Sequence, residues 1–212
     1  MKELPFNKVL VISAHTDDFE FGCGATVNRL IRQSSEIFSV VFSICEDSVP
    51  KDLPKDTLLK EMYNSAKHFG IKKENIRVFK FPVRKFPQYR QDILEELVKI
   101  QKTVKPDLVF TSSRHDIHQD HQVICEESIR AFRFQTILGY ELPWNNLSFN
   151  NNALIEVEKT DLDVKIAAIA EYKSQDFRHY SKKEFFQMHA QLRGIQNKTK
   201  FAEAFEAIKI TL

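Results

Sequence analysis

Residues 8–26 read KVLVISAHTDDFEFGCGAT, and the prediction of the fold starts from this stretch. Its first six residues form a short apolar run rich in β-branched side chains, which indicates a buried parallel strand. A polar loop with His15, Asp17 and Asp18 follows, and then a helical pattern begins. Ligands of open α/β sheets bind just beyond the carboxyl ends of such strands. We therefore expect these three side chains to face a ligand, and their types suit a metal ion and its water.

A second stretch far downstream has the same layout. Residues 107–112 (DLVFTS) predict another buried strand, and RHDIHQDH at residues 114–121 brings His118 and His121 after it, before an amphipathic segment at 122–132. If the two strands are neighbours in one parallel sheet, both loops open at the same edge. His15, Asp18 and His121 would then offer two ring nitrogens and one carboxylate oxygen, which is typical of a catalytic Zn²⁺ site with one open position. Such a set also accepts Fe²⁺, cobalt or manganese.

The rest of the chain alternates between predicted strands and helices. We expect strands at residues 37–45, 76–81, 136–141 and 153–157, helices at 26–33, 56–69, 89–104, 161–172 and 182–192, and a short apolar segment at 201–208. This rhythm predicts an α/β fold with a doubly wound, mostly parallel, Rossmann-like sheet and helices on both faces. A length of 212 residues suits a single domain over residues 1–212.

Composition limits the compartment and the partners. A formal net charge of +2 gives no reason to expect a nucleic-acid partner. No apolar run approaches the roughly 20 residues of a transmembrane helix, and the N-terminus lacks the apolar stretch of a signal peptide. Three cysteines without metal-finger spacing are expected to be free thiols. Together these features predict a cytoplasmic protein.

Phenylalanine is abundant, with 18 residues in the chain. These residues either fill the core or form apolar patches between subunits, and the second possibility predicts a homo-oligomer. Five of them fall at predicted element ends or in irregular segments: Phe81, Phe86, Phe132, Phe134 and Phe149.

The two polar motifs resemble those of the LmbE-like (PIG-L) N-acetyl-sugar deacetylases. The likeness rests on H-T-D-D-x-E-F-G-C-G and D-x-H-x-D-H, and it continues through GYELPWNN at 139–146, YKSQ at 172–175 and AEAF at 202–205. Thr16 and Gln119 stand where proline is commoner in the family, and Ala25 replaces a usual glycine. The resemblance implies a metal-dependent hydrolase that removes the N-acetyl group from an amino sugar or its glycoconjugate.

The resemblance also implies a role for each residue of the motifs. His15, Asp18 and His121 correspond to the zinc ligands, Asp17 to the general base, and His118 to the residue that assists the transition state. In this interpretation the metal activates a water molecule and Asp17 accepts its proton. We expect His118 to act as a charged imidazolium.

Two further carboxylates are expected to support the histidines. A metal-bound histidine commonly donates its second ring N–H to a carboxylate, which fixes the ring tautomer. Asp116 and Asp120 lie beside His118 and His121 in the sequence and suit this role. The sequence leaves open which carboxylate serves which ring.

Residues at the end of the fifth predicted strand and just after it are candidates for contacts with the substrate. Tyr140 and Trp144 could provide an aromatic platform for a sugar ring, while Glu141 and Asn145 could bond its hydroxyls. For Trp144, packing beside Pro143 is an alternative of equal weight. The expected substrate is a small-molecule, lipid-linked or nucleotide-linked N-acetyl sugar.

A basic segment offers a second kind of substrate contact. Arg84, Lys85 and Arg90 could meet the phosphate of a linked sugar, although a solvated basic loop is the commoner reason for such a pattern.

Two other functions remain open from the sequence. One is a metal-dependent amidohydrolase of the same fold that acts on a non-sugar N-acyl substrate. The other is a non-catalytic nucleotide-binding protein with Gly22-Cys23-Gly24 as its phosphate turn. Val27 occupies the place of the third glycine of that fingerprint, and the second motif would have no role.

Overall fold

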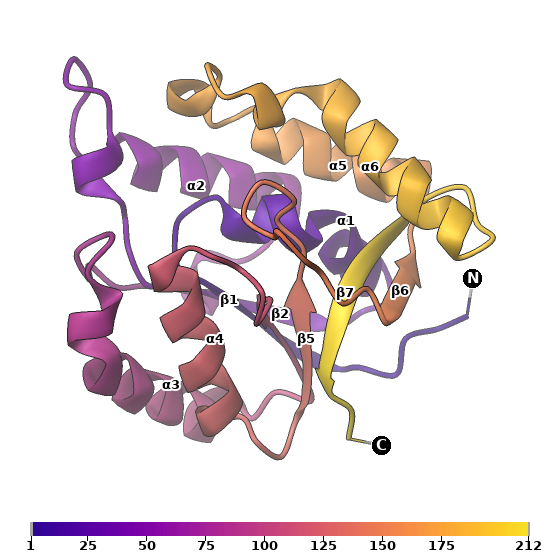
Figure 1. The fold of residues 1–212 in the computed structure, drawn as a ribbon, viewed down its shortest axis with the longest axis horizontal. Helices are drawn as coiled ribbons and strands as arrows, with labels where there is room; N and C mark the ends of the chain where they lie inside the picture. Colours follow the sequence, from indigo (N-terminus) through magenta and orange to yellow (C-terminus); the bar gives the residue numbers. More distant parts are fainter. Residues whose placement is uncertain (1, 212) are drawn as a thin grey trace.

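The computed structural model describes residues 2–211, in which a seven-stranded sheet lies between two layers of helices (Figure 1). The strands are β1 (Lys8–Ser13), β2 (Glu36–Val41), β3 (Ile76–Val78), β4 (Leu108–Ser112), β5 (Thr136–Tyr140), β6 (Ala153–Glu156) and β7 (Ala202–Lys209). The helices are α1 (Asp18–Arg32), α2 (Thr57–His68), α3 (Arg90–Val104), α4 (Gln119–Ala131), α5 (Lys159–Ile169) and α6 (Lys183–Gln196).

The strand order is β3-β2-β1-β4-β5-β7-β6. Strands β1 to β5 pair in parallel, whereas β7, the apolar segment at 201–208, runs antiparallel between β5 and β6. This confirms the predicted doubly wound, mostly parallel sheet. The order reverses between β1 and β4, and crevices at such a switch point are where ligands bind in this class of fold. Both polar motifs leave the sheet there.

Strand β1 is buried on both faces, which explains its continuous apolar sequence. Val9 and Val11 pack into the core cluster on one face, beneath α1, α5 and α6, and Leu10 and Ile12 pack into the cluster on the other face, beneath α3 and α4. All four side chains are fully buried. Burial of one such side chain contributes about 1.5–3 kcal/mol to stability, so this strand anchors both layers.

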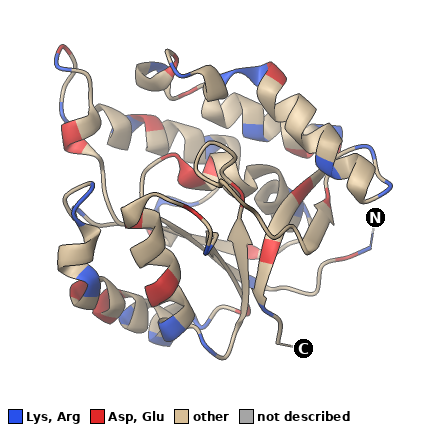
Figure 2. Cartoon of the chain, viewed as in Figure 1, with Lys and Arg blue, Asp and Glu red and all other residues tan. Residues whose placement is uncertain are grey.

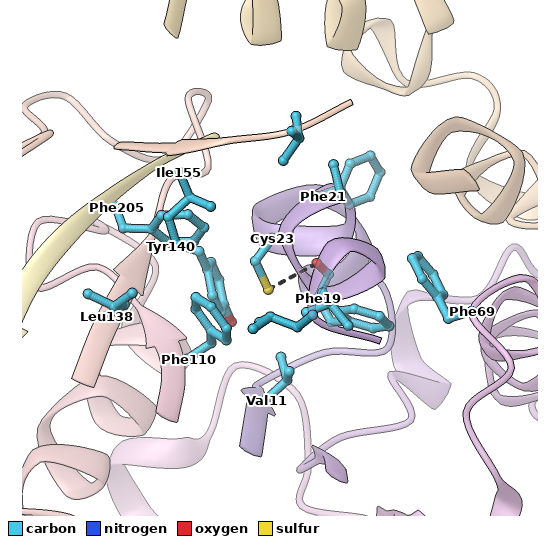
Figure 3. Packing of buried hydrophobic residues seen from close by; sticks show 14 of the residues in the cluster. Val11, Phe19, Phe21, Cys23, Phe69, Phe110, Leu138, Tyr140, Ile155 and Phe205 are labelled. Carbon is cyan, nitrogen blue, oxygen red and sulfur yellow. Dashed lines mark hydrogen bonds between the residues drawn. The ribbon is translucent and has the colours of Figure 1, made fainter. Parts of the chain in front are cut away.

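Helix α1 begins at Asp18. The sequence had predicted a later start, at residue 26. Gly22 and Gly24 therefore lie inside the helix, where a glycine costs about 1 kcal/mol relative to alanine. A Cβ atom at Gly22 would lie 2.4 Å from the ring of Tyr140, and one at Gly24 would lie 3.2 Å from the side chain of Lys165. The glycines let α1 approach β5 and α5 closely (Figure 3 shows Tyr140 beside this helix). They do not form the phosphate turn of the nucleotide-binding alternative.

A buried ion pair meets the same part of α1. The carboxylate of Glu203 accepts hydrogen bonds from the amides of Ala25 (3.3 Å) and Thr26 (2.7 Å). Lys165 Nζ donates to the carbonyl of Phe21 (2.7 Å) and to Glu203 (2.6 Å). Side chains from α5 and β7 thus bond backbone amides and a backbone carbonyl of α1. In a regular helix such groups bond only to other backbone groups of the same helix. The pair therefore joins α1, between Phe21 and Thr26, to both α5 and β7.

All three cysteines are buried and free. Phe86 and Phe132 belong to the core, whereas Phe134 is 70% exposed, so only part of the proposed phenylalanine set is available for subunit contacts. No helix within residues 2–211 is both long and apolar enough to cross a bilayer. Positive and negative residues are interspersed over the helices (Figure 2), in line with the small net charge.

Candidate metal centre and active-site cavity

The loops after β1 and β4 bring the motif residues together, as the sequence predicted. His15 lies in the first loop, His118 precedes α4, and His121 lies in the first turn of α4. One ring nitrogen from each of these three histidines lies within 4.8 Å of the others, which makes them a potential metal-binding group. Asp18, the first residue of α1, faces the same point.

Three of these side chains have the spacing of a metal site. His15 Nδ1 lies 3.0 Å from His121 Nε2, and Asp18 Oδ1 lies 3.3 Å from His121 Nε2 and 3.7 Å from His15 Nδ1. Tetrahedral ligands bound at about 2.0–2.2 Å from a zinc ion are roughly 3.3–3.6 Å apart. The three atoms can therefore hold one divalent cation, and they fit it more closely than the three imidazoles do.

Asp120 orients His15. Its carboxylate is fully buried, lies 3.0 Å from His15 Nε2, and accepts hydrogen bonds from the amides of Arg84 (2.6 Å) and Phe86 (3.2 Å). His15 Nε2 therefore carries the proton that it donates to Asp120. The lone pair of Nδ1 is left to point at the metal centre.

Asp116 has the same role for His121. Its carboxylate lies 2.7 Å from His121 Nδ1, and it also accepts hydrogen bonds from the amide of His118 (2.8 Å) and from Asn145 Nδ2 (3.4 Å). The Nε2 lone pair of His121 then points toward His15 Nδ1. Of the two rings that the sequence considered, His121 is thus served by Asp116, whereas Asp120 bonds the ring of His15 and not that of His118.

The centre favours positive charge. Two lone pairs and a carboxylate oxygen meet here, and they repel one another unless a cation or proton lies between them. Burial alone would lower the pKa of His121, but the carboxylates of Asp18 and Asp116 raise it to about 10. Burial would raise the pKa of Asp18, yet His121 and His15 hold it well below its usual range. The ligand atoms and the negative electrostatic potential of the carboxylates fit a divalent cation.

His118 differs from the expectation of a charged imidazole. Burial, together with the nearby rings of His121 and His15, lowers its pKa to about 4. Both neighbouring carboxylates bond other rings, and His118 Nδ1 instead accepts a hydrogen bond from the amide of Asp120 at 3.2 Å. His118 is therefore a neutral ring with its proton on Nε2. It can donate a hydrogen bond but does not supply a full charge.

Asp17 lies beside the centre and lines the adjacent cavity. Burial and the charge of Asp18 raise the pKa of Asp17, and Arg178 and His15 oppose this shift. A carboxylate with increased proton affinity is suited to accept a proton from water.

The cavity next to the centre has a volume of about 250 Å³. Trp144 and Asn145 line it, as expected for contacts with a substrate. Trp144 stacks on Tyr180, with ring centroids 3.9 Å apart and an interplanar angle of 10°. Tyr180 and Arg178 also line the cavity. The sequence analysis missed these two residues because they lie in an irregular segment after α5, where only their aromatic and basic character was a signal.

Tyr140 and Glu141 are not among the lining residues, and the expectation that they contact the substrate is not supported. Tyr140 is 1% exposed and its hydroxyl donates to the carbonyl of Ile12 at 3.1 Å. Glu141 is buried and pairs with His189 (2.9 Å) and Arg193 of α6. Both side chains stabilise the fold around the site.

With this geometry established, comparison with known proteins identifies the family. Residues 10–132 match the family model "PIG-L: GlcNAc-PI de-N-acetylase". An uncharacterized deacetylase, YaiS, from Escherichia coli (strain K12) is 32% identical over 171 residues, which cover 78% of this chain and 90% of the relative. The chain belongs to the PIG-L family. It is accordingly an N-deacetylase, a hydrolase of amide bonds.

Solved structures share the PIG-L fold at low sequence identity. The N,N'-diacetylchitobiose deacetylase from Pyrococcus horikoshii has a TM-score of 0.77 and 22% identity, with 95% of this chain and 84% of that chain covered. GalB, the 4-carboxy-2-hydroxymuconate hydratase from Pseudomonas putida KT2440, has a TM-score of 0.80 and 19% identity, with 97% and 98% covered. The second similarity shows that this fold also supports a different reaction.

The role of Asp120 can be tested with a single atom change. We expect Asp120→Asn to weaken zinc affinity about 10–100-fold, because the neutral amide supports the His15 ring less well than a carboxylate does. The affinity is measured by competition with a chromophoric chelator. Asp107→Asn is the matched control, since this carboxylate also accepts two backbone amides, those of Asn7 and Lys8, at the opposite end of β4. Equal affinities in the two variants would contradict the assignment.

Proposed function

We propose that this chain is a zinc-dependent hydrolase that removes the acetyl group from an N-acetylated amino sugar or its glycoconjugate. The observation that carries the proposal is the convergence of His15 Nδ1, His121 Nε2 and Asp18 Oδ1, no more than 3.7 Å apart, at the edge of a cavity. Membership of the PIG-L family supports the reaction type.

The metal ligands in this proposal are His15, Asp18 and His121. A divalent cation held by them would lower the pKa of water from about 15.7 toward about 7 and would polarise an acyl oxygen. Zinc is the proposed ion because two imidazoles and one carboxylate are typical ligands of a catalytic zinc site. Fe²⁺ is accepted by the same donors.

Asp17 and His118 handle protons and developing charge. Asp17 accepts a proton from the attacking water and returns it to the nitrogen of the departing amine, so that the products are acetate and a free amino group. His118 donates its Nε2 proton in a hydrogen bond to the acyl oxygen as that atom gains negative charge. A neutral donor is sufficient for this task.

The cavity supports a sugar-sized substrate. About 250 Å³ lies below the range of roughly 300–1,000 Å³ that is usual for pockets of drug-sized ligands, so a longer conjugate must extend out of the cavity. The stacked rings of Trp144 and Tyr180 offer an apolar wall for the carbon face of a pyranose. Asn145 offers an amide to a hydroxyl.

A non-sugar N-acyl compound is the second candidate substrate. The hydratase from Pseudomonas putida has this fold, and its named substrate is not an amino sugar. The same catalytic groups would hydrolyse an N-acylated amino acid derivative without change in mechanism.

Metal analysis of the purified protein and an acetate-release screen test the proposal together. We expect about one metal ion per chain, and acetate from N-acetyl sugars after zinc is restored to the chelated protein. Acetate from N-acetyl amino acids alone would favour the second candidate. A metal-free protein that gains no activity with any divalent cation would reject both.

A separate prediction concerns His118. We expect His118→Ala to lower turnover about 10²–10³-fold while the metal content is unchanged, because one hydrogen bond to the developing oxyanion is lost. His115→Ala is the control, since the ring of His115 faces Glu206 and does not line the cavity. Unchanged kcat in the His118 variant would remove this residue from the mechanism.

A further inference from the structure

We infer that the substrate carries an oxyanion, either a phosphate or a carboxylate, and that Arg84 and Arg178 recognise it. The inference rests on the proposed function and narrows its substrate class. Both arginines line the cavity that contains Asp17 and His118. They come from separate segments, Arg84 from the loop between β3 and α3 and Arg178 from the segment between α5 and α6.

Arg84 is held in an unfavourable backbone conformation. Its φ angle is +66°, and the left-handed region costs a non-glycine residue about 1–2 kcal/mol. The surrounding contacts that hold it are the carboxylate of Asp120, which accepts its amide at 2.6 Å, and Gln119 Nε2, which donates to its carbonyl at 3.4 Å. Such a conformation persists only where the surrounding contacts hold it.

The same carboxylate fixes Arg84 relative to the metal centre. Asp120 bonds the amide of Arg84 on one side and the ring of His15 on the other. The backbone of Arg84 is therefore fixed in position beside the proposed ligand His15. A side chain that begins at this position is suited to contact a substituent of the bound substrate.

Neither guanidinium has a carboxylate partner within 4.0 Å among residues 2–211. Arg84 makes one long side-chain hydrogen bond, to Ser48 Oγ at 3.5 Å, and Arg178 donates to the Tyr180 hydroxyl. By contrast Arg90, which the sequence grouped with Arg84, pairs with Glu126 and Glu127 of α4. Two arginines thus remain available on the cavity wall.

The chemistry of arginine favours an oxyanion as the ligand. A guanidinium presents its N–H groups in a planar fork that matches two oxygens of a phosphate or carboxylate. A neutral sugar would offer no negative charge to either guanidinium, and Arg178 would then face only the charge of Asp17 across the cavity. Lys85 is exposed and is not a lining residue, so it offers a control of equal charge next to Arg84.

Trp144 provides a direct measure of binding because it is the only tryptophan in the chain and lies on the cavity wall. Its fluorescence is titrated with four amino sugars: glucosamine, glucosamine 1-phosphate, glucosamine 6-phosphate and muramic acid. The two phosphates and the carboxylate distinguish the sources of the anion. The matching N-acetyl compounds are assayed for acetate release with the zinc-loaded protein.

We expect at least one anionic sugar to bind about 10–100-fold more tightly than glucosamine, as a hydrogen bond to a charged group implies. Arg84→Met should reduce this preference to the level seen with glucosamine, and raised salt should weaken the preference of the wild-type protein. Lys85→Met should keep it. Arg178→Met is a second variant that tests the opposite wall, and circular dichroism and metal content establish that each variant is folded.

The inference is overturned if the wild-type protein binds glucosamine as tightly as every anionic sugar, or if Arg84→Met and Arg178→Met leave an observed preference intact. The proposed function fails in a different way. If no N-acetyl compound releases acetate while the fluorescence titration still shows the preference, deacetylation of these sugars is rejected and the anion site stands.

Discussion

His121→Ala is expected to lose the metal ion and, with it, all measurable deacetylation. His121 Nε2 lies 3.0 Å from His15 Nδ1 and 3.3 Å from Asp18 Oδ1, so its removal leaves two ligands around the proposed cation. Metal per chain is measured by elemental analysis after dialysis, and folding by circular dichroism.

His68→Ala is the matched control for this variant. His68 also lies 3.0 Å from a carboxylate, that of Glu171, but it is on the surface of α2 away from the cavity. This control should retain its metal. Full occupancy in His121→Ala would show that another donor completes the site, and His118 would then be the first candidate because its ring belongs to the same cluster.

Asp17→Asn is expected to keep the metal and to lower kcat about 10²–10⁴-fold, since the asparagine amide cannot accept a proton from water. The substitution is close in size and leaves His15 and Asp18 in place. Stopped assays of acetate release and elemental analysis measure the two effects. Normal turnover in this variant would exclude Asp17 as the base.

The pH profile gives a second test of Asp17. A general base must be unprotonated, so activity is lost as the pH falls through the pKa of Asp17. Burial and the neighbouring charge of Asp18 raise this pKa, so the acid limb should lie above the usual aspartate value of about 3.9. The residual activity of Asp17→Asn should lack this limb. A limb of unchanged position in both proteins would assign it to another group.

The fold and the convergence of the motifs could be predicted because they depend on local patterns. Continuous apolar runs at residues 8–13 and 107–112 indicated strands buried on both faces, and the ends of neighbouring parallel strands open at one edge. Those two facts were sufficient to predict that His15 lies near His121. The predicted start of α1 was wrong because Gly22 and Gly24 are tolerated inside the helix through contacts with distant residues. A local sequence pattern does not contain such contacts.

Details of the site depend on tertiary packing and were harder to predict. The pairing of Asp120 with His15 joins residues 105 positions apart, and a local pattern does not contain such a contact. Tyr140 and Glu141 were expected in the cavity, but the former turns into the core and the latter is held by α6. Arg178 lies in an irregular segment whose path has no sequence period.

The contact between Glu203 and α1 has a consequence for biosynthesis. The amides of Ala25 and Thr26 emerge early from the ribosome, whereas their carboxylate partner arrives with β7. In a nascent polypeptide the parallel strands β1 to β5 therefore precede the strand whose carboxylate bonds α1. We therefore expect the packing of α1 against β7 to be completed late in translation.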